Sequence, residues 1–285
     1  MIEVLAPGPY ATVQDLGRHG YAHLGVPCSG AADAGSLRLA NRLVGNPEHL
    51  AGVEVTFGGA RLRFLEGAWA ALAGAPCPVS GGAGGAGMGV PFWVPKGGEV
   101  RLGTPEWGLR TYLAVRGGIA VEPVLGSRST DSLSGLGPPP LRAGTVLPVG
   151  PAAGLAEIEV DLAPPPGPRP AVLRVLPGPR DDWFAPEALE TLCAAPYTVS
   201  QDSNRVGVRL RGAEPQRARE GELPSEGMVT GAVQVPPSGQ PIVFLSDHPP
   251  TGGYPVIAVV SEADLAVAAQ LRPGDTVWFR VMPHP

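Results

Sequence analysis

Several side chains capable of binding or proton transfer gather between residues 223 and 255. A carboxylate in this stretch can accept a hydrogen bond from a substrate N–H or act as a general base, whereas glutamine and tyrosine can orient a substrate carbonyl. These residue types together favour an amide or a cyclic amide as the ligand. Asp247 and Glu226 are therefore the candidate catalytic residues. The candidate substrate-binding residues of the same stretch are Gln234, Gly252, Gly253 and Tyr254.

Each of these residues also has a structural interpretation. Asp247 lies two residues before Pro249 and can form an Asx turn, while Gly252 and Gly253 can simply adopt positive φ. Both interpretations stay open for Asp247. The structural interpretation is the favoured one for three others, namely Glu226, Gln234 and His248.

Short strands separated by turns must position these side chains. β-Branched, aromatic or alternating residues bounded by Gly and Pro predict strands at residues 53–57, 60–65, 111–115, 231–235, 242–245 and 256–260. Helices are predicted at 33–44 and at 263–271, the second opened by the capping-box pattern Ser261-Glu-Ala-Asp264. The pattern is that of a mostly β, barrel-like fold with few helices.

Composition indicates a folded, turn-rich protein. The 285 residues include 41 glycines and 35 prolines, but 44% are hydrophobic and only 16% are charged, which argues against disorder. A net charge of -5 without a basic cluster disfavours nucleic acid and anionic membranes as partners. Because the sequence shows neither a signal-peptide pattern nor a membrane-length run of roughly 18 apolar residues, we expect a cytoplasmic location.

A glycine-rich run contains a G-x-G-x-x-G pattern at Gly82, Gly84 and Gly87. In nucleotide-binding proteins this pattern links a strand to a helix whose N-terminus meets the phosphate. Here the following residues, 90–95, contain two prolines and read as a strand or an extended loop. The run is therefore interpreted as a turn between strands, and any ATP is expected to bind another chain.

The three cysteines predict neither a disulfide framework nor a metal site. Cys28, Cys77 and Cys193 are odd in number, far apart and outside any C-x-x-C pattern. Cys28 can be a nucleophile or a small apolar residue in a turn, and the second interpretation is favoured.

An internal repeat predicts two related domains. Val4-Leu-Ala-Pro-Gly-Pro9 is echoed by Val175-Leu-Pro-Gly-Pro179, and residues 141–146 are echoed by 271–277. At the offset relating Val4 to Val175, Ser29, Arg38 and Leu39 match Ser200, Arg209 and Leu210. We expect one domain at 1–160, carrying an insertion, and another at 170–285, joined through the proline-rich linker 163–170.

Ordered motifs along nearly the whole chain resemble the biotin-dependent carboxyltransferase-like family. This family includes the C subunit of 5-oxoprolinase, KipA, and proteins labelled allophanate hydrolase subunit 2. The matching motifs lie at residues 12–20, 25–33, 36–47, 112–119, 125–131, 231–236 and 251–255.

The resemblance implies two tandem cyclophilin-like β-barrels. It also implies that the chain acts with a KipI-like B subunit and a third, A subunit, opening 5-oxo-L-proline to L-glutamate with ATP hydrolysis. Phosphorylation of the unreactive lactam carbonyl would make its carbon electrophilic. Asp33, in the matched motif 25–33, and Ser203, in the stretch 203–210 that corresponds to another family motif, are further candidate substrate-binding residues.

The chain departs from the family pattern in two motifs. Relatives often have Ser-Asp-Arg-Met-Gly-Tyr-Arg-Leu where this chain has Ser-Asn-Arg-Val-Gly-Val-Arg-Leu at 203–210, and Asp-Arg-Gln-Thr-Thr-Gly-Gly-Tyr where it has Asp-His-Pro-Pro-Thr-Gly-Gly-Tyr at 247–254. The second change removes an arginine. Arg205 or Arg128 can replace it as a fork for a substrate carboxylate, or each can brace a loop.

Two other functions are alternatives to the 5-oxoprolinase hypothesis. One is carboxyl transfer from a partner's carboxybiotin to a urea-like acceptor; because Lys96 is not in a Met-Lys-Met setting, biotin would have to arrive on another chain. The other is a KipA-like regulator that binds a KipI-like kinase inhibitor.

Overall fold

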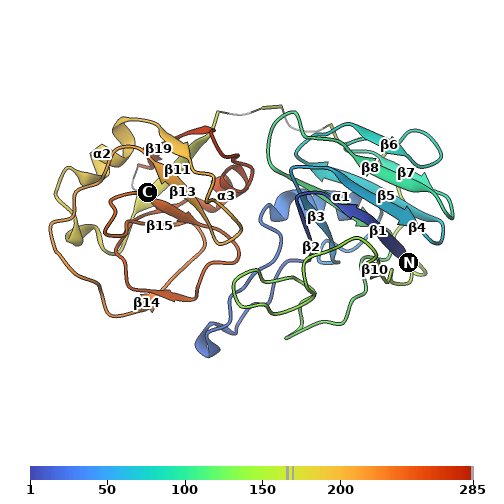
Figure 1. The fold of residues 1–285 in the computed structure, drawn as a ribbon, viewed down its shortest axis with the longest axis horizontal. Helices are drawn as coiled ribbons and strands as arrows, with labels where there is room; N and C mark the ends of the chain where they lie inside the picture. Colours follow the sequence, from blue (N-terminus) through green and yellow to red (C-terminus); the bar gives the residue numbers. More distant parts are fainter. Residues whose placement is uncertain (165–166, 169, 284–285) are drawn as a thin grey trace. The chain divides into compact units, whose positions relative to one another are not determined.

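The computed structural model describes residues 1–164, 167–168 and 170–283, and its chain is mostly β with three α-helices in that part (Figure 1). The chain divides into two compact units. The first consists of Met1–Arg18, Ser29–Asp131 and Gly135–Pro168. The second consists of His19–Cys28, Ser132–Ser134 and Arg169–Pro285. Two short segments from the N-terminal half therefore belong to the second unit.

The first unit is built from two five-stranded sheets. One has the order β10-β1-β4-β8-β6, with β10 Val146–Leu147, β1 Ile2–Pro7, β4 Ala60–Phe64, β8 Glu99–Leu102 and β6 Val79–Gly81. The other has the order β2-β3-β9-β5-β7, with β2 Tyr10–Gln14, β3 Gly52–Thr56, β9 Arg110–Val115, β5 Ala68–Gly74 and β7 Pro91–Val94.

Alternating side chains explain how this unit buries its core. In β4, Ala60, Leu62 and Phe64 are buried whereas Arg61 is exposed, as expected for a strand with one face on the core. Strand β9 is buried along its whole length. Its second face is covered by helix α1, Ala34–Leu43, whose apolar side packs on β5 and β9.

The second unit contains a closed seven-stranded barrel of order β11-β18-β15-β16-β13-β12-β19. Its strands are β11 Val172–Pro177, β18 Val256–Val260, β15 Ala232–Gln234, β16 Ile242–Phe244, β13 Gly207–Arg211, β12 Tyr197–Val199 and β19 Thr276–Val281. A two-stranded sheet pairs β14, Glu226–Gly227, with β17, Thr251–Gly252. The remaining elements are helices α2, Ala188–Ala194, and α3, Glu262–Ala269, and the 3-10 turns η1, Ala22–Leu24, and η2, Asp181–Trp183.

The predicted strands and two predicted helices are confirmed, with ends that differ by one or two residues. Helix α2 was missed, because its N-cap residue Glu187 makes no side-chain capping bond and leaves no N-terminal signature. The capping box expected before α3 is wrong in its contacts. Ser261 is the N-cap but makes no side-chain bond, and Asp264 instead forms an ion pair with Arg174.

The structure contradicts part of the repeat. Arg38 and Leu39 lie in helix α1, whereas their proposed counterparts Arg209 and Leu210 lie in strand β13, so that part of the alignment is wrong. The terminal strands also pair differently, since β1 and β10 are antiparallel whereas β11 and β19 are parallel. The duplication and the cyclophilin-like character of both units stay predictions. Residues 165, 166 and 169 of the predicted linker lie outside the described residues.

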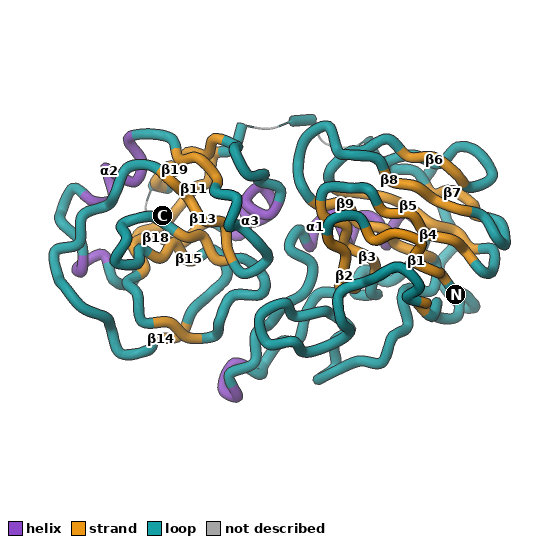
Figure 2. The backbone as a smooth tube through the Cα atoms, viewed as in Figure 1, coloured by secondary structure: helices purple, strands orange, loops and turns teal. Residues whose placement is uncertain are grey.

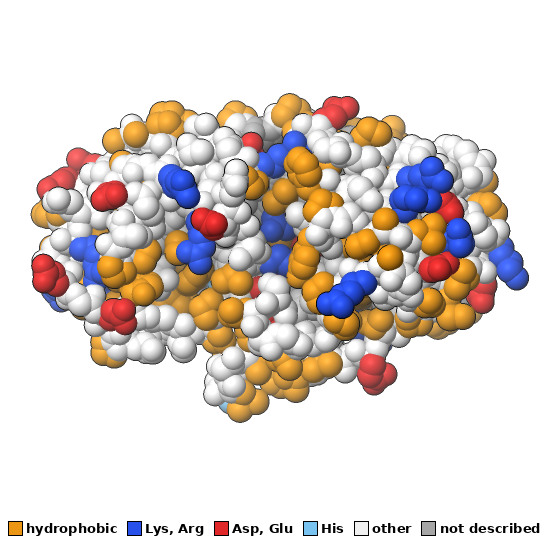
Figure 3. Space-filling model, in the orientation of Figure 1, with side chains coloured by type: hydrophobic (Ala, Val, Ile, Leu, Met, Phe, Trp, Pro, Cys, Tyr) orange, Lys and Arg blue, Asp and Glu red, His pale blue; other side chains and the backbone are white. Residues whose placement is uncertain are grey.

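The glycine-rich run forms a turn between β6 and β7, as predicted, and no helix follows it. Long loops join the short strands of both units (Figure 2). No helix in the described part of the chain is long and apolar enough to cross a bilayer. On the face shown in Figure 3, acidic and basic side chains are interspersed.

Candidate functional site

Asp247 and Arg205, two predicted site residues, meet in a buried ion pair in the second unit. Arg205 Nε donates to Asp247 Oδ2 at 2.9 Å and Arg205 Nη2 donates to Oδ1 at 3.0 Å, which is the two-pronged geometry of a strong guanidinium–carboxylate pair. Oδ2 also accepts from the backbone N of Ser132 at 3.0 Å and from its Oγ at 2.6 Å. Four donors thus converge on one fully buried carboxylate.

This arrangement bears on the predicted roles of both residues. Asp247 Oδ2 already accepts three hydrogen bonds and the Arg205 fork is turned toward Asp247. The geometry supports bracing of the loop by Arg205 and anchoring of the segment Ser132–Ser134 within the second unit. The catalytic role of Asp247 stays a prediction.

His248 follows Asp247 and is also buried. Its ring stacks on Phe244, with centroids 5.7 Å apart, and Nδ1 lies 2.9 Å from the carbonyl oxygen of Pro249. Burial lowers the pKa of His248, and it outweighs the opposing effects of the Pro249 carbonyl and Asp247. The imidazole is therefore a buried ring whose neutral form is favoured and which makes one polar contact, to the Pro249 carbonyl.

Glu226 lies in the small sheet, directly opposite Gly252 in the β14–β17 pairing. Arg180 Nε donates to both carboxylate oxygens, at 2.9 and 3.0 Å, and Arg180 Nη2 also donates to Oε1. The Arg180 hydrogen bond lowers the pKa of Glu226. A carboxylate held ionised in this way is a weak general base, although it remains an acceptor for a substrate N–H.

Gln234 and the loop 252–254 come together at the end of strand β15. Gln234 Nε2 donates to the backbone carbonyl of Tyr254 at 2.9 Å and contacts Met228 Sδ at 3.9 Å. A Cβ on Gly252 would lie 2.9 Å from Gln234 Nε2, so a larger residue there would displace the Gln234 amide. Gly252 and Gly253 do not have positive φ, so the structural interpretation that these glycines serve to allow positive φ is wrong.

The other predicted residues are held elsewhere. Ser203 hydrogen-bonds with Arg209, its Oγ accepting from the Arg209 backbone N at 3.0 Å. In the first unit, Asp33 caps helix α1 by accepting from Ser36 N at 3.0 Å. Arg128 Nε donates to the Val121 carbonyl at 2.8 Å, as a loop brace does. Their predicted substrate contacts stay predictions.

Asp15 organises a second polar region, in the first unit, which sequence reasoning did not single out. Its carboxylate accepts from Ser127 Oγ and Ser129 Oγ, each at 2.6 Å, from Arg128 N at 2.6 Å and from Gly17 N at 2.8 Å. These bonds fix the loop 127–129 beside residues 14–18. These residues lie in the motifs 12–20 and 125–131, which resemble the family. The motifs marked this part of the chain, but they did not indicate which side chains interact there.

Around this region lie four buried side chains that the prediction missed. Each has a buried polar atom without a hydrogen-bond partner, and the atoms are Gln14 Oε1, Arg18 Nη1, Ser29 Oγ and Thr130 Oγ1. We refer to these four residues as the Arg18 cluster.

Cys28 lies close to an imidazole in the second unit. Its Sγ is 3.2 Å from His19 Nδ1, and the thiol is partly exposed. A neighbouring histidine can take up the thiol proton and leave the nucleophilic thiolate. In the described part of the chain, no group of three or more His, Cys, Asp or Glu residues is placed to hold a metal ion.

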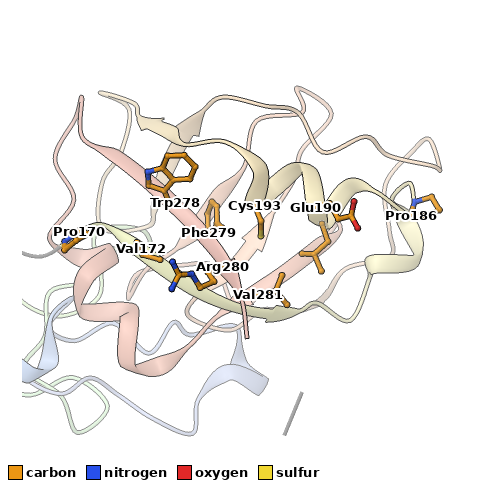
Figure 4. A pocket seen from close by; sticks show the side chains of 10 residues that line it. Pro170, Val172, Pro186, Glu190, Cys193, Trp278, Phe279, Arg280 and Val281 are labelled. Atoms are coloured by element: carbon orange, nitrogen blue, oxygen red, sulfur yellow. The ribbon is translucent and has the colours of Figure 1, made fainter. Parts of the chain in front are cut away.

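A cavity of about 770 Å³ lies beside strand β19 in the second unit. Figure 4 shows side chains from α2, β19 and the start of β11 around it, including Cys193, Trp278 and Phe279. None of the predicted site residues lines this cavity. Its mainly apolar wall does not match the polar amide chemistry predicted from the sequence.

Comparison with known proteins places the chain in a family. The family described as "Carboxyltransferase domain, subdomain A and B" matches residues 24–281. The C subunit of 5-oxoprolinase from Escherichia coli (strain K12) is 38% identical over 289 residues, covering 98% of this chain and 90% of that protein.

Two solved structures resemble the fold throughout. The crystal structure of TTHA0988 is 41% identical with a TM-score of 0.87, and the match covers 98% of this chain but 55% of the other, so the chain spans about half of it. The K. lactis urea amidolyase is 33% identical with a TM-score of 0.91, and the match covers 99% of this chain and 19% of the other. The chain therefore belongs to the carboxyltransferase domain family, subdomains A and B.

Proposed function

We propose that this chain is the C subunit of an ATP-dependent 5-oxoprolinase that hydrolyses 5-oxo-L-proline to L-glutamate. The observation that carries the proposal is the match to the C subunit of E. coli 5-oxoprolinase, which extends over 98% of this chain and 90% of that protein. The match to urea amidolyase covers a similar share of this chain but only 19% of the larger protein.

The polar groups support a lactam as the substrate class. Opening a lactam requires recognition of an N–H and a carbonyl, followed by attack of water on the carbonyl carbon. Glu226 and Gln234 lie near the β17 loop, where an ionised acceptor and an amide are held on short strands. The proposed partners are a KipI-like B subunit and the 5-oxoprolinase A subunit, and ATP is proposed to bind outside this chain.

Reconstitution tests the proposal directly. The purified chain is combined with the A and B subunits, and ATP hydrolysis is measured with and without 5-oxo-L-proline. We expect glutamate formation and 5-oxoproline-dependent ATP turnover only when all three are present, and no ATP binding by the isolated chain in calorimetry. A complete complex that forms no glutamate contradicts the proposal.

The urea amidolyase similarity favours a second candidate, carboxyl transfer to a urea-like acceptor. The TM-score of 0.91 to the K. lactis protein supports it, as does the carboxyltransferase name of the family. In this case the carboxybiotin is carried by a partner chain. Carboxylation of urea by this chain with a loaded biotin carrier, without 5-oxoproline turnover, would establish this candidate in place of the first.

A further inference from the structure

The Arg18 cluster is unusual because four buried hydrogen-bonding atoms of the first unit have no partner. Gln14, Arg18, Ser29 and Thr130 are all more than nine-tenths buried. Most buried polar atoms in native proteins have a partner, since an unsatisfied one loses its hydrogen bonds to water without replacement. Several such atoms in adjoining segments therefore indicate a site that a ligand completes.

Hydrogen bonds and close backbone contacts bring the four residues into one region. Gln14 Nε2 donates to the Thr130 carbonyl at 3.0 Å, and the guanidinium of Arg18 donates to the carbonyls of Ser129 and, at 3.4 Å, Val124. The chain after Ser29 runs against the same segment. A Cβ on Gly30 would lie 2.8 Å from the backbone N of Gly17, and Ala31 N donates to the Asp15 carbonyl at 2.9 Å.

The charge of Arg18 is the strongest indication of what binds. Arg18 is among the largest fully buried side chains of the protein. Among the residues that the structure describes, Arg18 forms no ion pair, and its hydrogen bonds go to the neutral backbone carbonyls of Val124 and Ser129. A buried cation without a counter-charge is costly, so an anionic group on the ligand is favoured beside Nη1.

The other three atoms define the rest of the ligand. Gln14 Oε1 can only accept a hydrogen bond, so it calls for a ligand N–H. The hydroxyls of Ser29 and Thr130 can donate to a carbonyl or carboxylate oxygen. Ser29 also adopts a φ of 55°, a left-handed conformation that non-glycine residues rarely keep unless the site requires it.

We propose that Gln14, Arg18, Ser29 and Thr130 form a binding site for a small carboxylate that also carries an amide N–H. 5-Oxoproline belongs to this class, whereas urea supplies the N–H and the carbonyl but no negative charge. The identification with 5-oxoproline rests on the proposed function, while the carboxylate-amide class rests on the cluster itself.

Calorimetric titration of the isolated full-length chain tests the ligand class. The probes are 5-oxo-L-proline, pyrrolidin-2-one, which lacks the carboxylate, and urea. Because a hydrogen bond to a charged group is among the strongest in proteins, we expect 5-oxo-L-proline to bind at least about tenfold more tightly than either neutral probe. Equal or tighter binding of a neutral probe overturns the assignment.

Two variants test the residues. Thr130→Val removes a buried hydroxyl that has no partner, so the ligand-free protein should melt at a higher temperature while 5-oxo-L-proline binds about tenfold more weakly. Arg18→Gln should weaken binding about tenfold to a hundredfold. Since Arg18 also supports two carbonyls and its loss can disturb folding, Thr130→Val provides the independent test. The exposed Arg142→Gln is the control and should change neither property.

The outcomes separate this site from the proposed function. A cluster that holds water alone predicts unchanged ligand affinity in Thr130→Val, and that result overturns the site. If the three-subunit complex turns over 5-oxoproline with an unaltered KM in a folded Arg18→Gln variant, the site is wrong and the function stands. If the isolated chain binds 5-oxo-L-proline and Thr130→Val weakens it, the site stands even where the complex shows no turnover.

Discussion

Two buried arginines, Arg18 in the first unit and Arg205 in the second, have opposite electrostatic surroundings. Arg205 is 3% exposed and forms a two-pronged pair with Asp247, which Ser132 completes. Arg18 is 2% exposed and donates to backbone carbonyls, with Nη1 left without a partner. The two side chains have the same chemistry and nearly the same burial, so they differ in the groups that accept their hydrogen bonds.

A structural network and a binding site differ in whether their buried charges have partners. A buried charge with a full set of partners holds elements together, and its unused capacity for a ligand is small. A buried charge without a counter-ion is stable only because the surrounding fold over-determines its position, and a ligand can supply the missing partner. Residue type alone does not distinguish these cases.

The largest effect is expected from breaking the satisfied network. Asp247→Ala removes the buried carboxylate that accepts both prongs of the Arg205 guanidinium, so we expect the free energy of unfolding to fall by about 3–5 kcal/mol. Thr130→Val, in the Arg18 cluster, should raise the free energy of unfolding, because it removes a buried hydroxyl that has no partner. Urea unfolding of both variants under the same conditions measures the contrast.

A double-variant cycle sharpens this contrast. Arg205→Met combined with Asp247→Leu removes both charges and should recover much of the stability that either single change loses. Asp247→Asn keeps the shape of the side chain without its charge. If Asp247→Asn folds normally but abolishes turnover of the reconstituted complex, Asp247 is catalytic and our structural interpretation of it is wrong.

A smaller loss of stability is expected at Gln234. Its amide donates to the Tyr254 carbonyl, whereas Gln14 Oε1 has no partner. Gln234→Met removes the donor that holds the Tyr254 carbonyl, so we expect a loss of about 1–2 kcal/mol in the free energy of unfolding. Gln240→Met is the control, because water can replace the hydrogen bonds of that partly exposed side chain. Equal losses in the two variants would show that burial of the Gln234 contact is unimportant.

The strands could be predicted from sequence because their signals are local. Alternation in 60–64 and the apolar run in 256–260 directly reflect which faces are buried. Helix α2 gave no such signal, since it is short and uncapped. The repeat alignment was wrong at Arg38 and Arg209, because identical residue types can occur in a helix or in a strand.

The site was harder to predict because its contacts are distant in sequence. Asp247 and Arg205 were each predicted to contact a substrate. Nothing in the sequence shows that they pair with one another, or that Asp247 accepts a hydrogen bond from Ser132, which precedes it by 115 residues. The Arg18 cluster was missed for a related reason. Its distinguishing property is a lack of partners, which only the three-dimensional arrangement reveals.

The stability of the fold should depend on pH through His248, whose buried ring stacks on Phe244 and lies near the Pro249 carbonyl. Because burial lowers its pKa below the ordinary 6.5, the unfolded chain binds the proton more readily than the folded chain. The stabilisation is therefore present above pH 6.5 and is lost as the pH falls through the lowered pKa. We expect the fall in Tm between about pH 7.5 and 5.5 to be smaller in His248→Phe than in the natural chain.

His49→Gln supplies the control for this measurement, because His49 is exposed. Its melting temperatures should follow those of the natural chain across the same range. A His248→Phe profile that is parallel to the natural one would mean that His248 titrates alike in the folded and unfolded states.

The smallest effect on stability, and a specific effect on reactivity, is expected at Cys28. The contact between Cys28 Sγ and His19 Nδ1 lies on a partly exposed surface, so its loss should leave Tm unchanged. Burial raises the pKa of the Cys77 and Cys193 thiols, which disfavours their thiolates. Iodoacetamide should therefore alkylate Cys28 first, as followed by peptide mass spectrometry. His19→Gln should slow this alkylation, whereas His23→Gln, at an exposed histidine of the same segment, should not. Faster alkylation of Cys193 than of Cys28, or equal rates in both histidine variants, would show that the imidazole contact does not activate the thiol.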